Sequence, residues 1–326
     1  NDQRVFLEND TISPHTKLRS EDDPNDPKVY QKFYPKTFST DIMLHKALDF
    51  VEKQQDQPFF LFYASPLPHL PLQAPQKWVD YYRKKIGPEY PYLGDNGYFP
   101  CEYPKATYAA MISYLDEQVG MLIKKLKDEN LLENTLIVFT SDNGATFSTG
   151  GAPTIFFESN GEFGAERGRS KGFLKEGGIK VPLIVSMKGK VSPGKQTDLL
   201  TFFPDYWATF SELAGAEIPL NTDGISFLPT IFPTNIPQKK HPFLYWEITE
   251  YGGQQALRMD NWKLYRGDIK KSGNLTFSLY DLNNDPTELN DIAHLYPNQV
   301  KKMAEIINQQ HVKAEISSFH LEVLDR

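Results

Sequence analysis

Residues 136–145 have the sequence Leu136-Ile-Val-Phe-Thr-Ser-Asp-Asn-Gly-Ala145, and this stretch decides the fold. Its short, continuous run of β-branched and aromatic residues predicts a buried strand. Polar residues follow at the carboxyl end of that strand, where open α/β sheets bind their ligands. Asp142 offers two carboxylate oxygens and Asn143 one carbonyl oxygen, a hard-oxygen set that suits Ca²⁺ or Mg²⁺. The alternative interpretation is an Asx turn that simply closes the strand.

Two further segments place reactive side chains beside predicted strands. The first is Gln57-Pro-Phe-Phe-Leu-Phe-Tyr-Ala-Ser-Pro-Leu-Pro-His-Leu-Pro71, where a strand from Phe59 to Ala64 leads into a stiff proline loop with His69. The second is a glycine-rich loop over residues 168–178 that contains Lys171 and precedes a strand from Val181 to Ser186. Three strand ends therefore carry a metal-ligand pair, a histidine and a lysine.

Helices alternate with these strands along the first 237 residues. Apolar spacing predicts helices over residues 40–53, 106–129 and 198–215. Such alternation implies crossover connections, so we expect an α/β fold with a largely parallel central sheet flanked by helices. Residues 1–38 are expected to form an excursion over this domain, and residues 66–105 a long loop.

A second, smaller subdomain is predicted after the Pro- and Lys-rich stretch at residues 233–242. The expected domains are therefore residues 1–237, the α/β domain, and residues 238–326, an α+β subdomain. Turn signals separate four short runs that predict an antiparallel sheet, and a helix is expected to close the chain. The strands are predicted over residues 243–247, 255–259, 262–266 and 277–281, and the helix over residues 298–313.

Composition excludes several classes of protein. The net charge of −7 argues against a nucleic-acid partner or an anionic membrane surface. An anionic substrate would therefore need a local cationic cluster, such as Arg167, Arg169 and Lys171. The sequence contains no apolar run of about 18 residues that would span a membrane, and it does not begin with a signal peptide. Its single cysteine excludes an internal disulfide.

In their order and spacing these segments resemble the sulfatase family, in the branch of arylsulfatases and bacterial carbohydrate sulfatases. The resemblance implies part of the alkaline-phosphatase-like sulfatase fold. The strings that carry it are Pro58-Phe-Phe-Leu61 with Pro68-His69, Tyr114-Leu-Asp-Glu-Gln-Val-Gly120, Thr135-Leu-Ile-Val-Phe-Thr-Ser-Asp-Asn-Gly144, Lys171-Gly-Phe-Leu-Lys-Glu-Gly-Gly178 with Val181-Pro182, and Tyr280-Asp-Leu-Asn-Asn-Asp-Pro-Thr-Glu288. Lys175 and Lys180 stand where the family pattern has Tyr and Arg.

The resemblance implies a sulfuric ester hydrolase that acts on a sulfated sugar or glycan. Asp142 and Asn143 are then expected to bind Ca²⁺, with Mg²⁺ as the alternative. His69 and Lys171 are the expected catalytic residues, each in contact with the sulfate group. A secreted or periplasmic location is also implied. The resemblance leaves open which sugar and sulfate position are used, whether action is endo or exo, and the oligomeric state.

One family motif is absent from this sequence. Sulfatases carry a Cys-x-Pro/Ala-x-Arg string, or its Ser equivalent, whose first residue becomes the formylglycine nucleophile. Cys101 lies in another context, and Asp22-Asp23 follows no predicted strand, so neither replaces the family's nucleophile or its early aspartate pair. We expect that the sequence starts inside a longer protein and that this chain alone is inactive, with a pseudoenzyme as the other account.

Two alternatives to the sulfatase function remain open from the sequence. The first is a phosphonate or phosphodiester hydrolase of the same superfamily, and the second is a non-catalytic protein that binds sulfated glycans. A polar group in the smaller subdomain is interpreted either as a reader of sugar hydroxyls or as a solvated hairpin, and Glu176-Gly-Gly178 as a loop-shaping string. The polar group is Glu247, Tyr251, Gln254, Gln255 and Arg258.

Overall fold

The structure is a computed structural model that describes residues 4–54, 57–218 and 221–325. The chain divides into two compact units. The first contains Asn1–Thr135 and Thr146–Ser159, and the second contains Leu136–Ala145 and Asn160–Arg326. The boundary predicted between residues 237 and 238 falls inside the second unit and stays a prediction.

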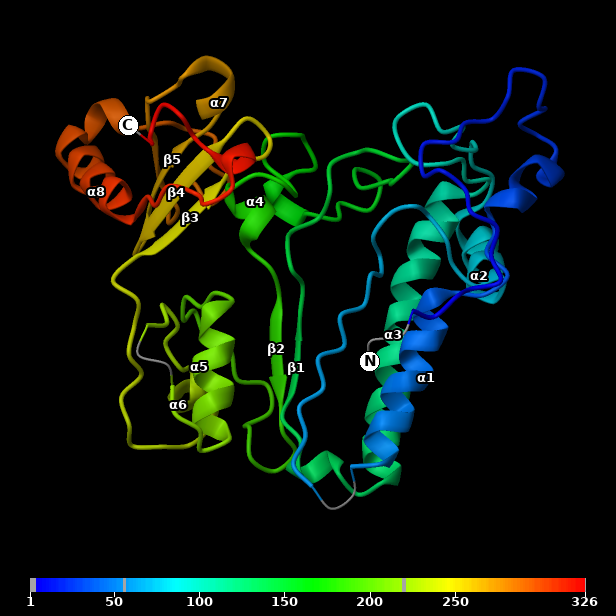
Figure 1. Cartoon of the computed structure of the whole chain (residues 1–326), viewed down its shortest axis with the longest axis horizontal. Helices are drawn as coiled ribbons and strands as arrows, with labels where there is room; N and C mark the ends of the chain where they lie inside the picture. Colours follow the sequence, from blue (N-terminus) through cyan, green and yellow to red (C-terminus); the bar gives the residue numbers. More distant parts are fainter. Residues whose placement is uncertain (1–3, 55–56, 219–220, 326) are drawn as a thin grey trace. The chain divides into compact units, whose positions relative to one another are not determined.

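Three helices organise the first unit: α1 (Ser39–Glu52), α2 (Gln76–Ile86) and α3 (Pro104–Asp128). α1 and α3 confirm the two helices predicted there, and both α1 and α2 pack against α3 (Figure 1). α2 lies within the predicted long loop, which corrects that prediction. Its apolar side chains Trp78, Val79, Tyr82 and Ile86 recur at helical spacing and join the core, so the periodicity was present in the sequence.

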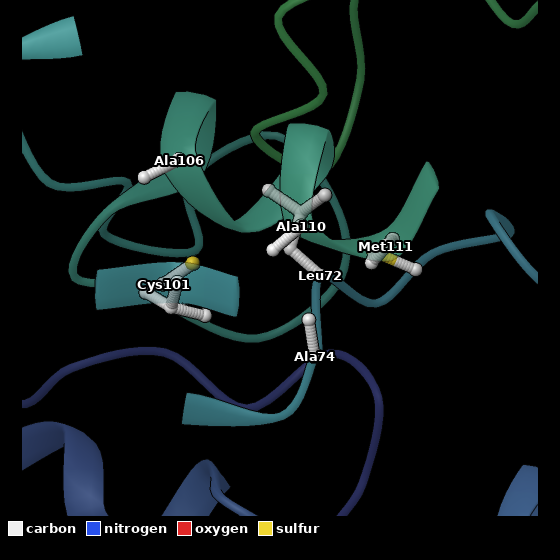
Figure 2. Close-up of a cluster of buried hydrophobic side chains, with 7 residues drawn as sticks. Leu72, Ala74, Cys101, Ala106, Ala110 and Met111 are labelled. Carbon is white, nitrogen blue, oxygen red and sulfur yellow. The ribbon is translucent and has the colours of Figure 1, made fainter. Parts of the chain in front are cut away.

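Cys101 is a core residue of this unit. Figure 2 shows it among Leu72, Ala74, Ala106, Ala110 and Met111, and only 5% of Cys101 is exposed. Burial raises the pKa of its thiol to about 12, so the nucleophilic thiolate is scarce at neutral pH. Cys101 therefore serves as a packing residue of this core.

The strand predicted from Phe59 to Ala64 is not formed among the described residues. Phe60 and Phe62 are exposed there, whereas the predicted strand was expected to be buried. A β-strand needs a neighbouring strand to satisfy its backbone hydrogen bonds. The hydrophobic pattern of one segment does not show whether such a neighbour exists.

Strands β1 (Ile137–Thr140) and β2 (Leu183–Ser186) form a two-stranded sheet in the second unit. Their pairing is antiparallel, with Thr140 opposite Leu183, whereas the sequence predicts a largely parallel central sheet. Parallel strands need a crossover that spans the sheet, usually a helix. Here the connection leaves and re-enters at the same end of the sheet, and its one α-helix, α4 (Glu176–Ile179), is a single turn.

The C-terminal sheet confirms the predicted antiparallel meander. Its order is β3-β4-β5-β6, and helix α8 packs on it to enclose a core of Leu257, Leu264, Leu279, Met303 and Ile307 (Figure 1). The strands are Leu244–Ile248, Gln254–Met259, Trp262–Arg266 and Ser278–Asp281, and α8 is Pro297–Gln310.

The remaining helices are short. α5 begins at Pro204, later than the predicted start at residue 198, because proline suits the first turn of a helix better than its interior. None of the helices in the described parts of the chain is long and apolar enough to cross a membrane. The short helices are α5 (Pro204–Leu213), α6 (Leu228–Ile231) and α7 (Ile269–Ser272), with 3₁₀ turns at Pro27–Phe33, Leu132–Asn134, Gly161–Phe163, Ala293–Leu295 and Ser317–Phe319.

Candidate functional site

The loop after β1 and the loop before β2 are joined by backbone hydrogen bonds. The amide of Gly144 donates to the carbonyl of Gly178 at 2.9 Å, and the amide of Lys171 donates to the carbonyl of Ala145 at 2.9 Å. Both loops leave the same end of the β1–β2 sheet. The structure therefore brings together the segments that carry Asp142, Asn143 and Lys171.

Glycine is required where these loops meet. A Cβ on Gly144 would lie 2.0 Å from the carbonyl oxygen of Gly177, which no real side chain tolerates. A Cβ on Gly178 would lie 2.0 Å from the carbonyl oxygen of Phe173. The glycines therefore permit a close backbone approach, which gives Gly144 a further role besides the sharp turn expected of it.

Asp142 and Asn143 present oxygen atoms at this junction. Asp142 is exposed, and its carboxylate has no hydrogen-bond or ion-pair partner within the described part of the chain. Asn143 is half-buried and donates its amide nitrogen to the carbonyl of Gly144 at 3.0 Å, which leaves its amide oxygen as an acceptor.

These donors fit part of the coordination shell of a hard cation. Asp142 and Asn143 supply at most three side-chain oxygens, whereas Ca²⁺ takes six to eight ligands. Residues 4–54, 57–218 and 221–325 contain no group of three or more His, Cys, Asp and Glu residues that could hold a metal. The chemistry of the two residues fits, and further ligands would be needed to complete the shell.

Lys171 is half-buried, and its ammonium group has no carboxylate partner among the described residues. A fixed cation of this kind is suited to an anionic ligand. The neighbouring cations differ. Arg169 donates to the carbonyl of Thr287, and Lys175 donates to the Glu288 carbonyl at 3.1 Å and the Tyr280 hydroxyl at 3.3 Å. Arg169, expected in a cationic cluster with Arg167 and Lys171, and Lys175 are therefore both bonded to the C-terminal part of the chain.

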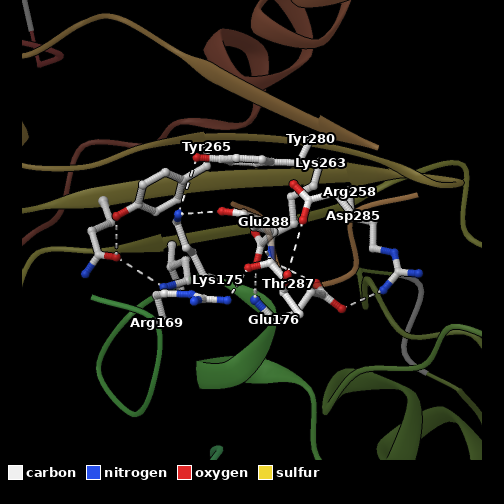
Figure 3. A network of polar contacts seen from close by, with 12 residues as sticks. Arg169, Lys175, Glu176, Arg258, Lys263, Tyr265, Tyr280, Asp285, Thr287 and Glu288 are labelled. Carbon is white, nitrogen blue, oxygen red and sulfur yellow. Dashed lines mark hydrogen bonds and ion pairs between the residues drawn. The ribbon is translucent and has the colours of Figure 1, made fainter. Parts of the chain in front are cut away.

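A buried ionic network follows Lys171 along the same loop (Figure 3). The Glu176 carboxylate pairs with Lys263 at 2.8 Å and with Arg258 at 2.9 Å, and Lys263 also pairs with Glu288 at 3.4 Å. Burial raises the pKa of Glu288, and the nearby Lys263 offsets this only partly. Burial also acts to raise the pKa of Glu176, but Lys263 and Arg258 outweigh it and the net pKa is lowered. Burial lowers the pKa of Lys175.

His69 belongs to the first unit, so its predicted convergence with the other site residues stays a prediction. Its ring is exposed, and Nδ1 lies 2.7 Å from the carbonyl oxygen of Leu70. Because a carbonyl oxygen only accepts, Nδ1 carries the proton in this contact. The other ring nitrogen, Nε2, is then the atom suited to meet a ligand.

The polar group interpreted either as a reader of sugar hydroxyls or as a solvated hairpin has internal partners. Gln254 and Gln255 are fully buried, and Arg258 pairs with Glu176. Glu247 accepts from Gln255 and from His311, whose Nδ1 lies 2.8 Å away. This group therefore builds the subdomain, although Tyr251 remains 43% exposed.

Comparisons with known proteins agree with the sequence motifs. A family model described as Sulfatase matches residues 3–216, and one described as N-sulphoglucosamine sulphohydrolase, C-terminal, matches residues 161–317. The chain is similar to arylsulfatase A of Homo sapiens, with 28% identity over 82% of this chain and 50% of the relative. It is also similar to an N-acetylgalactosamine-6-O-sulfatase of Bacteroides thetaiotaomicron, with 26% identity over 82% of this chain and 50% of the relative.

A solved structure shares this fold. It is Ps i-CgsB in complex with k-i-k-neocarrahexaose, with a TM-score of 0.65 and 27% identity over 84% of this chain and 55% of that chain. This likeness confirms the α/β fold class predicted from the sequence. The chain spans about half the length of these relatives.

Proposed function

The chain belongs to the sulfatase family, and from this premise we propose that the protein hydrolyses the sulfate ester of a sulfated carbohydrate. Two relatives support the carbohydrate: one is named an N-acetylgalactosamine-6-O-sulfatase, and another is described in complex with k-i-k-neocarrahexaose. The observation that carries the proposal is the junction at which Lys171 and Ala145 share a backbone hydrogen bond. This contact joins the loop that carries Lys171 to the loop that carries Asp142 and Asn143.

Each residue has a distinct part in the proposed reaction. Asp142 and Asn143 would hold a hard divalent cation, Ca²⁺ first and Mg²⁺ as the alternative, which would act as a Lewis acid toward a sulfate oxygen. Lys171 donates charge-assisted hydrogen bonds to the sulfate and stabilises the charge that builds as the S–O bond breaks. His69 would donate from Nε2 to the sulfate or to the departing oxygen when its ring carries a second proton, and would accept a proton at Nε2 when the ring is neutral.

The described residues provide contacts to the sulfate rather than the nucleophile. Cys101 is buried and protonated at neutral pH, so it cannot attack a sulfate ester. Hydrolysis is therefore proposed for the complete protein, with the formylglycine nucleophile that the family resemblance implies.

The proposal is tested by sulfate release from 4-nitrophenyl sulfate and from sulfated oligosaccharides. A chelator should abolish release by the complete protein, and Ca²⁺ should restore it. Asp142→Ala should raise the Ca²⁺ concentration needed for half-maximal rate, whereas Asp198→Ala, another exposed aspartate of the same unit, should not.

Three outcomes would count against this function. If the chelator does not change the rate of sulfate release, the protein does not use the proposed metal ion. Faster hydrolysis of a phosphonate ester than of any sulfate ester would favour the related phosphonate hydrolases. Tight binding of a sulfated glycan without turnover would identify a glycan-binding protein.

A further inference from the structure

We propose that Gln254 is a positioning residue for Lys171, so that a side chain of the C-terminal sheet determines whether the sulfate-binding cation is correctly placed. This inference rests on the proposed function of Lys171. It concerns a residue that touches neither the expected sulfate nor the metal.

Gln254 binds the loop of Lys171 through both ends of its amide group. Its Oε1 accepts from the amide of Leu174 at 3.1 Å, and its Nε2 donates to the carbonyl of Gly172 at 2.9 Å. The side-chain amide thus takes the place of a peptide group in a neighbouring strand. Gly172 directly follows Lys171, so the fixed carbonyl lies one peptide away from the residue that carries the cation.

The surroundings of Gln254 prevent it from following a moving loop. Gln254 is fully buried in β4, and the hydroxyl of Tyr265 donates to the same Oε1 at 3.1 Å. On the loop side, Gly172 has a φ of +89°, and a Cβ there would lie 2.5 Å from the ring of Tyr251. Tyr251 also packs against Phe173, with ring centroids 5.2 Å apart. The loop is therefore held between Gln254 and Tyr251 with no room for a side chain at residue 172.

The buried ionic network anchors the same loop at its other end. Glu176 pairs with Lys263 and Arg258, and its backbone amide donates to the Glu288 carboxylate at 2.5 Å (Figure 3). Removal of one of these charges would leave its partner buried and unpaired, which endangers folding. Gln254 is neutral, so its replacement isolates the effect on the loop.

Gln255 provides a matched control on the same strand. It is also fully buried, but it accepts from Arg266 at 2.8 Å and donates to Tyr245 at 2.9 Å, both residues of the C-terminal sheet. Gln254→Leu and Gln255→Leu remove the same amide at adjacent buried positions, and Gln255→Leu also takes hydrogen bonds from the charged side chains of Arg266 and Glu247, so it is the more severe test of general destabilisation. Only the first removes bonds to the Lys171 loop.

The first measurement is hydrogen exchange of residues 170–176 in the two variants. We expect Gln254→Leu to speed exchange of the Leu174 amide at least tenfold beyond any change in global unfolding. Gln255→Leu should lower the melting temperature while leaving exchange in this loop within twofold once global unfolding is allowed for. Equal loss of loop protection in the two variants would overturn the proposal.

The second measurement separates positioning from general destabilisation. In the complete protein, Gln254→Leu should lower kcat/KM for the sulfate ester at least tenfold, and Gln255→Leu less than twofold. In the Lys171→Ala background, Gln254→Leu should add less than a twofold further loss, because the cation that it positions is gone. An undiminished loss in that background would overturn the inference. If Lys171→Ala itself has no effect, the proposed function of Lys171 fails, and the exchange data still report whether Gln254 holds the loop.

Discussion

Lys171 is the side chain whose charge has the clearest chemical use. The described residues give it no carboxylate partner, whereas Lys175, four residues later, is half-buried and bonded to Tyr280 and Glu288. The two lysines therefore have different roles, although both read as loop cations in the sequence.

Lys171→Ala in the complete protein should lower kcat/KM for a sulfate ester by about 10²–10³, the usual effect of losing one preorganised donor to a developing charge. The thermal melt should change little, because a lysine without an ion pair contributes little to stability. Lys180→Ala is the matched control. Lys180 is exposed on the same segment, and its ammonium group lies 5.1 Å from the centre of the Phe163 ring. Lys175→Ala is unsuitable as a control because it removes buried contacts. Similar rate losses at Lys171 and Lys180 would contradict the assignment.

The buried carboxyl group of Glu288 leads to a prediction about how the stability of the protein depends on pH. Its pKa is raised in the folded protein by burial, so the folded state binds a proton that the unfolded state releases. Stability should therefore fall as pH rises from the ordinary glutamate pKa of 4.5 through the raised value. Glu288→Gln should remove this part of the pH dependence. Urea unfolding of both proteins from pH 4 to pH 8 measures it, and parallel curves would show that Glu288 does not titrate in this window.

At the scale of elements, the junction of the two site loops depends on backbone contact. The antiparallel register of β1 and β2 places both loops at one end of the sheet, and Gly144 then approaches Gly177 and Gly178 more closely than any other residue could. The loops are held by their own amides and carbonyls, so the side chains of Asp142 and Lys171 remain available for ligands.

Gly144→Ala should destabilise the second unit by about 1–3 kcal/mol, the usual cost of forcing extra atoms into a closely packed place. Faster hydrogen exchange should appear in residues 142–145 and 171–178. Gly120→Ala is the control in α3, where an added Cβ meets nothing within 4 Å. It should stabilise the protein by about 0.5–1 kcal/mol, because alanine favours a helix interior over glycine. Urea unfolding gives both values, and an unchanged stability for Gly144→Ala would refute the packing argument.

At the scale of the whole molecule, the candidate residues are divided between the two compact units. His69 comes from the first unit, and Asp142, Asn143 and Lys171 come from the second. The sequence predicts that they converge, since each lies next to a predicted strand end. That prediction can be tested by energetic coupling.

A double-mutant cycle of His69→Ala and Lys171→Ala should show non-additive losses in kcat/KM for the sulfate ester. Residues that contact one small group usually couple by about 0.5–3 kcal/mol, whereas distant and independent residues add within about 0.5 kcal/mol. The measurement is steady-state kinetics on the complete protein and its three variants. Additive losses would place His69 outside the site of Lys171.

Local patterns in the sequence determined the helices α1, α3 and α8, the C-terminal meander, the family and the candidate residues. These features depend on residue spacing and on motif order, both of which are properties of the amino-acid sequence itself. The helix α2 was also readable, because Trp78, Val79, Tyr82 and Ile86 recur at helical spacing.

Only the tertiary structure decided the direction of β1 and β2 and the roles of the polar residues around Lys171. Strand direction depends on the path of the connecting chain, and Phe59–Ala64 forms no strand among the described residues. The partners of Gln254 and Lys263 lie about 80 or more residues away, in the loop of Lys171. A hydrogen bond or ion pair between distant segments is a property of the folded chain, so no local sequence pattern predicts it.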